Sequence, residues 1–183
     1  LSRIGMALQY GFLRRGPMTM PPSTLGAFTK SDPSQPSANL EWHVQPLSLP
    51  KFGEPLHAFD AITPSVCNLR PSSRGRVFLQ HSDPLQAPAI RCNYLSTQDD
   101  LDIAVKGIEA TRAIMKAEAL AAYAPEELLP GPGKASQQDL EQAARELGTT
   151  IFHPVGTCAM GRVTNEGKSE NPLTVLDASF RLR

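Results

Sequence analysis

The stretch from Thr149 to Gly161, which reads T-T-I-F-H-P-V-G-T-C-A-M-G, combines residue types that are suited to chemistry. His153 carries an imidazole, a group that exchanges protons close to neutral pH. Pro154 fixes its own φ and pushes His153 toward an extended backbone, while Gly156 lets the chain turn or approach a ligand closely. The pattern predicts a proton-transferring histidine in a rigid and sterically open segment.

Two other chemistries are weaker interpretations of the same residues. A nucleophilic Cys158 with His153 as its base is disfavoured, because such partners normally come from separate parts of a fold and these two lie in one short segment. The four histidines show no H-x-x-x-H spacing, so no metal site is predicted. His43 either lines a pocket or is structural, and His57 and His81 are interpreted as structural.

The run H-P-V-G-T-C-A-M-G resembles the C-terminal signature of the glucose-methanol-choline (GMC) flavoprotein oxidoreductases, which carry a catalytic histidine in an H-x-x-G-T context. That context here is His153, Gly156 and Thr157. Further segments are similar to the family in order and spacing: G-P-M-T near the N-terminus, N-L-R-P-S-S-R-G-R-V at 68–77, S-D-P-L-Q-A-P-A-I-R-C-N-Y-L at 82–95, D-D-L-D at 99–102 and N-P-L-T-V-L-D-A-S-F-R-L-R at the C-terminus. The chain is therefore identified as a C-terminal substrate-binding and catalytic portion of a GMC, choline dehydrogenase-like, member.

The resemblance implies an FAD-dependent oxidation of a primary or secondary alcohol, a small-molecule substrate, with hydride transfer to the flavin. By this resemblance His153 is the base. Phe152 either packs on the substrate or is a core aromatic residue. Gly156 and Thr157 lie beside the cofactor, where they shape the turn or contact FAD.

Two departures from the family pattern affect this interpretation. The G-x-G-x-x-G dinucleotide fingerprint is absent, and the family's second active-site residue, a His or Asn, would lie beyond Arg183. We therefore expect a fragment of a longer enzyme, in which the missing Rossmann-like FAD-binding domain belongs to the same parent chain. The alternative is a non-catalytic binding module that retains only the substrate-domain fold.

Composition limits the possible partners and compartments. Basic and acidic residues balance at 18 each, so no excess positive charge attracts nucleic acid. No apolar run reaches the length that spans a bilayer, and no segment resembles a signal peptide. The cysteines are odd in number and form no C-x-x-C pair: Cys67, Cys92 and Cys158. Free thiols favour a reducing compartment such as the cytoplasm.

The secondary structure expected around the motif indicates an α+β fold, in which helices flank an antiparallel sheet. A hydrophobic content of 40% can build a core, and the 17 prolines favour a loop-rich domain. Residues 1–38 are predicted to be a helix end and a covering loop that lead into a substrate domain at 39–183. Strands are expected at 40–45, where apolar and polar residues alternate, at 57–69, interrupted near Pro64 in a way that indicates an edge strand or a bulge, and at 76–80 and 89–92, which a turn at 82–84 joins. Helices are expected at 4–12, 97–122 and 136–147, with Ser96 or Thr97 capping the second and Ser136 with Asp139 capping the third. The long connection at 18–39 is expected to be a loop.

Overall fold

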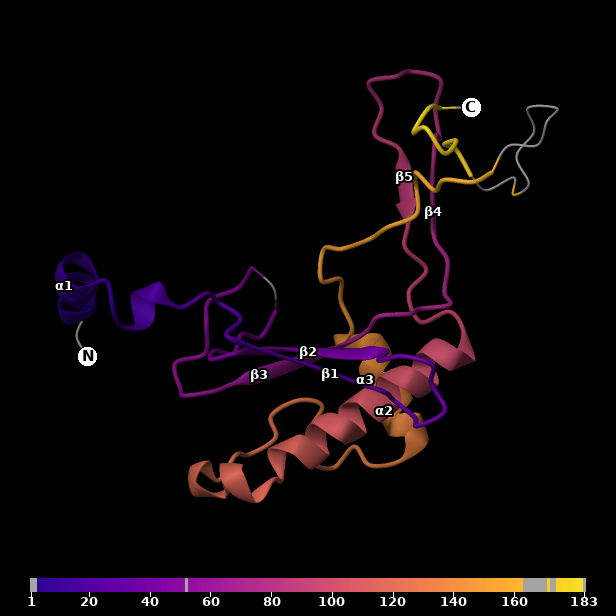
Figure 1. The fold of residues 1–183 in the computed structure, drawn as a ribbon. Helices are drawn as coiled ribbons and strands as arrows, with labels where there is room; N and C mark the ends of the chain where they lie inside the picture. The colour runs from indigo at the N-terminus through magenta and orange to yellow at the C-terminus, as the bar shows by residue number, and fades with distance from the viewer. Residues whose placement is uncertain (1–2, 52, 163–170, 172–173, 183) are drawn as a thin grey trace. The chain divides into compact units, whose positions relative to one another are not determined.

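The computed structural model describes residues 3–51, 53–162, 171 and 174–182 (Figure 1). These residues form two compact units, each built from two stretches of chain. Unit 1 lies within 1–72 and 97–146, and unit 2 lies within 73–96 and 147–183. The described residues combine α-helices with antiparallel strands, so the predicted α+β class is confirmed.

Unit 1 contains a three-stranded antiparallel sheet in the order β1-β2-β3. Strand β2, Leu40–Gln45, lies in the centre and pairs with β1, Leu25–Thr29, on one side and with β3, Thr63–Asn68, on the other. Pro64 lies on the edge strand β3, where a missing N–H is tolerated, as its place in the sequence predicts. The rest of the predicted strand segment, residues 57–62, is not a strand.

The connection at 18–39 is not the continuous loop that its prolines and serines suggested. A short 3-10 helix, Pro17–Thr19, is followed by strand β1. All five residues of β1 are exposed, so the strand shows no buried face that a sequence pattern could reveal. It exists because its backbone groups pair with β2, and the prediction of a loop was wrong there.

The core of unit 1 lies between the sheet and helix α2, Gln98–Met115 (Figure 1). Leu40 and Trp42 alternate along β2 and are buried, as the sequence predicts, and they pack against Ile103 of α2. The indole N–H of Trp42 donates to the hydroxyl oxygen of Thr111 at 2.8 Å, so a polar group in the core is satisfied.

Both helices that follow the sheet begin at the predicted caps. The Thr97 hydroxyl accepts from the backbone N–H of Asp100 at the start of α2. Ser136 and Asp139 exchange hydrogen bonds at the start of α3, Gln137–Leu147, in a reciprocal capping arrangement. Leu140, Ala143 and Ala144 form the buried stripe of α3.

Helix α2 is shorter than predicted. It ends at Met115, and a separate 3-10 helix covers Glu118–Tyr123. The guanidinium of Arg112 binds the carboxylate of Glu127 in a two-pronged contact, at 2.7 and 2.9 Å, and donates to the carbonyl of Gly131 at 3.1 Å. These contacts bring the following segment back along α2, which requires the chain to turn soon after the helix.

The N-terminal helix α1, Arg3–Leu13, stops where the sequence predicts. Arg14 and Gly16 both have positive φ, and Pro17 then opens the 3-10 turn. Within the described part of the chain, none of the helices combines the length and the apolar character that crossing a membrane requires.

Unit 2 contains a two-stranded antiparallel ladder, β4, Arg76–Phe78, paired with β5, Ala89–Arg91. The predicted pairing of these two strands is confirmed, with slightly shorter strands. Gly75, just before β4, lies so close to the facing strand that a Cβ there would collide with the carbonyl oxygens of Arg91 and Cys92. Only glycine fits at this position.

Candidate functional site

The H-P-V-G-T motif follows directly after helix α3, as the sequence predicts, and lies in unit 2. The segment 148–159 forms neither helix nor strand. The predicted site residues are all exposed there: Phe152, His153, Gly156 and Thr157. Because these residues are exposed in that unit, groups from outside it can reach them.

The backbone at Phe152 is held in an unusual conformation. Its φ is 64°, in the left-handed region that bulky residues avoid at a cost of about 1–3 kcal/mol. Its N–H donates to the hydroxyl oxygen of Thr150 at 2.9 Å, which supports the bend. Phe152 is 62% exposed, so within this unit its ring is not part of a core. Backbone strain of this kind is concentrated at functional sites, and here it lies in the residue before His153.

Gly156 supplies the open approach that the sequence suggested. Its φ is 104°, a conformation that favours glycine, and among the described residues beyond its two chain neighbours no heavy atom lies within 4 Å of the position where a Cβ would stand. The backbone, rather than a close neighbour, therefore requires glycine at this position. The surface beside it is free to accept another group.

The end of the motif is anchored to the C-terminal segment. The carbonyl of Ala159 accepts hydrogen bonds from the N–H groups of Val175 and Leu176, at 3.0 and 3.2 Å, and Gly161 donates to the carbonyl of Leu176 at 3.0 Å. Asp177 closes the next turn by accepting from the backbone of Arg181 at 2.9 Å. This pairing fixes the C-terminal end of the motif within unit 2. Pro172, Leu173 and Arg183 of the predicted C-terminal motif lie outside the described residues.

A second group of chemically capable side chains lies on the sheet of unit 1. Glu41 and His43 are two residues apart on β2, and Cys67 is the partner of Glu41 across β3. The Nε2 atom of His43 lies 3.3 Å from Oε1 of Glu41, and Sγ of Cys67 lies 3.9 Å from Oε2 of the same carboxylate. Burial, reinforced by the negative charge of Glu41, raises the pKa of the Cys67 thiol. This cluster was not found by sequence reasoning, because only the strand register brings Cys67 to the other two.

The remaining predicted histidines have local contacts. Nδ1 of His57 lies 3.0 Å from the hydroxyl oxygen of Ser48, and its ring stacks on Phe59 with centroids 4.8 Å apart. Nδ1 of His81 accepts from the backbone N–H of Asp83 at 3.0 Å, within the turn that joins β4 to β5. Both contacts fit the structural interpretation of these two residues.

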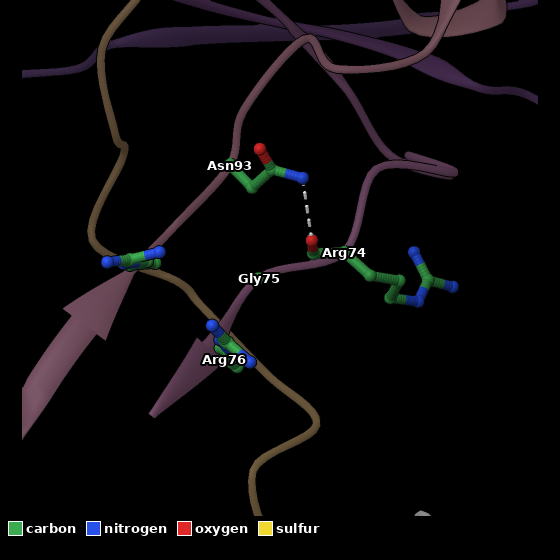
Figure 2. Close-up of a pocket in the computed structure, with 5 residues that line it drawn as sticks. Arg74, Gly75, Arg76 and Asn93 are labelled. Atoms are coloured by element: carbon green, nitrogen blue, oxygen red, sulfur yellow. Dashed lines mark hydrogen bonds between the residues drawn. The ribbon is translucent and has the colours of Figure 1, made fainter. Parts of the chain in front are cut away.

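A shallow pocket of about 240 Å³ lies beside the β4–β5 ladder in unit 2 (Figure 2). Its lining is mostly basic: Arg74, Gly75, Arg76, Arg91 and Asn93. Figure 2 shows the amide of Asn93 directed at the main-chain carbonyl of Arg74, to which it donates at 3.0 Å, and the side chain of Arg74 directed away from it. The guanidinium groups of Arg76 and Arg91 both stack on the ring of Phe78. The pocket does not include the motif residues.

Comparison with known proteins gives consistent matches. The family model described as GMC oxidoreductase matches residues 71–183. Similar curated proteins include an alcohol dehydrogenase [acceptor] from Pseudomonas putida, 34% identical over 95% of this chain and 30% of that protein. An oxygen-dependent choline dehydrogenase from Proteus mirabilis (strain HI4320) is 34% identical over 85% of this chain and 29% of that protein. The chain therefore spans less than a third of the length of these relatives.

Two crystal structures share the fold. Formate oxidase matches with a TM-score of 0.72 at 20% identity, covering 99% of this chain and 35% of that one. Pyridoxine 4-oxidase from Mesorbium loti matches with a TM-score of 0.65 at 24% identity, covering 88% of this chain and 30% of that one. Since the family match extends over more than half of the chain and includes the histidine motif, the chain belongs to the GMC oxidoreductase family.

Proposed function

We propose that this chain is the substrate-domain part of an FAD-dependent oxidoreductase that oxidises a primary or secondary alcohol to the carbonyl. The observation that carries the proposal is the family match over residues 71–183, which contains the exposed His153 beside the open Gly156. Two relatives are named as alcohol and choline dehydrogenases, and both names describe oxidation of a CH–OH group.

The residues present fit a flavin supplied from outside this chain's two units. Gly156 leaves its Cβ position open, so a flat ring system can approach the backbone there. The neighbouring Phe152, His153 and Thr157 are exposed in this chain. Under the proposal, the FAD-binding domain of the same parent chain holds the cofactor, and Gly156 and Thr157 border it.

When bound, FAD supplies the hydride acceptor. An imidazole nitrogen of His153 accepts the hydroxyl proton of the alcohol while the hydride leaves the same substrate's carbinol carbon, and the C–O bond becomes a carbonyl. Pro154 restricts the backbone of His153 and so limits the positions that its ring can take. Phe152 covers the apolar part of the substrate and excludes water.

The test is replacement of His153 by Ala in the complete protein. A positioned base contributes about 10²- to 10⁴-fold in rate, so flavin reduction by the alcohol should slow by that factor while the FAD content stays the same. His81→Ala is the matched control, because His81 contacts only the backbone of its own turn in the bonds described above. Unchanged flavin reduction in His153→Ala would overturn the assignment.

A second experiment tests the role of the FAD-binding domain. Residues 1–183 expressed alone should retain no FAD, because no G-x-G-x-x-G segment is present to hold the pyrophosphate. A yellow preparation that alcohol bleaches would contradict this part of the proposal.

A further inference from the structure

We propose that Glu41, His43 and Cys67 form a zinc-binding site on the face of the unit 1 sheet opposite the buried core. The inference does not depend on the alcohol oxidation proposed above. It is also contrary to the sequence-based expectation of no metal, which considered only histidine spacing along the chain.

The strand geometry places the three side chains on one face. Glu41 and His43 are separated by one residue on β2, so they project to the same side of the sheet. Cys67 is the direct cross-strand partner of Glu41, and such partners have Cβ atoms only about 4.5–5.5 Å apart. Leu40 and Trp42 project to the other side, into the core. The cluster is therefore fixed by backbone pairing rather than by flexible loops.

The distances between the ligand atoms are close to those of an occupied site. One ligand atom from each residue can be chosen so that all three lie within 4.8 Å of one another. The separation of the His43 nitrogen from the Glu41 oxygen is 3.3 Å, and that of the Cys67 sulfur from the other Glu41 oxygen is 3.9 Å. In a tetrahedral zinc site with bonds of about 2.0–2.3 Å, adjacent ligand atoms are separated by about 3.4–3.6 Å. The two separations run to different oxygens of Glu41, so side-chain rotation is needed to bring one carboxylate oxygen, the sulfur and the nitrogen to those values.

The ligand types select the metal. A thiolate, an imidazole and a carboxylate are all zinc ligands, whereas calcium and magnesium take oxygen ligands. Three protein ligands leave a fourth tetrahedral position for water or a donor atom of a small molecule. On the β1 side, the residue paired with His43 is Gly26, which has no side chain to fill that space. Coordination requires the thiolate, so the thiol proton of Cys67 leaves to solvent when the metal binds.

The arrangement has a simpler reading, an ion pair between His43 and Glu41 with a thiol nearby. His43 and Glu41 have side chains that are 37% and 19% exposed, so water and ions can reach the pair. The two readings differ in one measurable respect. Only the zinc site contains a metal–sulfur bond to Cys67, since the alternative has at most the thiol–carboxylate hydrogen bond.

The decisive measurement is zinc-edge X-ray absorption on the complete protein, stripped with a chelator and reloaded with one equivalent of Zn²⁺. Cys92 and Cys158 are replaced by Ser beforehand, because both are exposed thiols that could bind zinc adventitiously. We expect one sulfur neighbour at about 2.3 Å together with nitrogen and oxygen neighbours. A spectrum without sulfur would overturn the proposal, and this result needs no further variant.

Affinity measured by competition with a chromophoric chelator gives the second readout. Cys67→Ser and His43→Gln should each weaken Zn²⁺ binding by about 100-fold or more, since loss of a mere outer-shell partner already costs about 10- to 100-fold. His57→Gln is the matched control and should leave the affinity unchanged, because His57 contacts Ser48 and Phe59 instead. Equal affinity in wild type, Cys67→Ser and His43→Gln would contradict the site.

Discussion

The hydroxyl oxygens of Ser72 and Thr97 lie 2.7 Å apart, although 25 positions separate the two residues in the sequence. Ser72 is the last residue of the first stretch of unit 1, and Thr97 is the first residue of its second stretch. The buried carboxylate of Asp100 accepts from the backbone N–H of Ser72 at 2.8 Å and from its hydroxyl at 3.3 Å. The segment 73–96, which contains β4 and β5, therefore leaves unit 1 and returns to it at a single junction that these hydrogen bonds hold together.

Replacing Asp100 with Ala should destabilise unit 1. The carboxylate is only 2% exposed and also accepts from the side chain of Asn68 at 3.2 Å. Each buried donor left without an acceptor costs about 1–3 kcal/mol, so the free energy of unfolding should fall by at least that amount. Urea unfolding followed by far-ultraviolet circular dichroism measures the change.

The control for this prediction is Asp99→Ala in the same helical turn. Asp99 is exposed, so its loss removes only a favourable charge at the helix start, worth about 0.3–1 kcal/mol. Equal destabilisation by the two variants would show that the buried hydrogen bonds of Asp100 do not stabilise the junction between Ser72 and Thr97.

The start of helix α3 should depend on pH. The hydrogen bonds from the side chain and backbone of Ser136 lower the pKa of Asp139 below its ordinary value of 3.8. Because the pKa is depressed in the folded state, the stabilisation is fully present above the unfolded value and is lost as the pH falls through the folded value. Hydrogen exchange of the first-turn amides of α3 should accelerate in acid for this reason.

Two variants separate the cap from general acid unfolding. Ser136→Ala should weaken the first turn at neutral pH by about 1 kcal/mol, the usual cost of losing a cap. Asp139→Asn should abolish the part of the pH dependence that is confined to this turn. Retention of the same local acid sensitivity in Asp139→Asn would contradict the assignment.

Gly75→Ala should disrupt the β4–β5 ladder. The added methyl group would meet the carbonyl oxygens of Arg91 and Cys92, and backbone atoms cannot move aside as a flexible side chain can. Amide exchange in β4 and β5 should therefore speed up by at least about tenfold, which corresponds to 1.4 kcal/mol of local opening free energy. Gly133→Ala, whose new methyl group meets no non-adjacent described residue within 4 Å, should leave these amides unchanged.

Gly156→Ala tests whether the open space beside the motif is used. Gly156 and Gly53 both have strongly positive φ, 104° and 92°, and in the described part of the chain neither has a non-adjacent residue within 4 Å of its Cβ position. An alanine costs similar backbone strain at both sites, about 1–2 kcal/mol. In the complete protein, only Gly156→Ala should also slow flavin reduction or lower the FAD content. Equal activity of the two variants would show that nothing approaches Gly156.

Local sequence signals predicted the elements whose causes are themselves local. The alternation from Leu40 to Gln45 and the caps at Thr97 and Ser136 correctly predicted β2 and the starts of α2 and α3. Strand β1 was missed because its fully exposed residues carry no periodic burial, and its pairing depends on a distant partner. The end of α2 was misplaced because the alanine-rich sequence after Met115 favours helix, while Arg112 and Glu127 draw the chain back.

The candidate sites divide in the same way. The H-P-V-G-T segment is contiguous, so it could be recognised without any knowledge of the fold. The group on the sheet could not, since Cys67 lies 26 positions from Glu41 and joins it only through the register of β2 and β3. The strained backbone of Phe152 was equally invisible, because no local residue type requires a positive φ there.

The chain contains a single tryptophan, and Trp42 is 2% exposed at the junction between β2 and α2. Its indole is bonded to Thr111, so loss of that junction transfers the ring from a dry environment to water. Tryptophan emission from this chain is consequently a reporter of unit 1 alone. A change confined to the His153 segment would leave this emission unchanged, and a fluorescent probe placed in unit 2 would be needed to follow it in the same way.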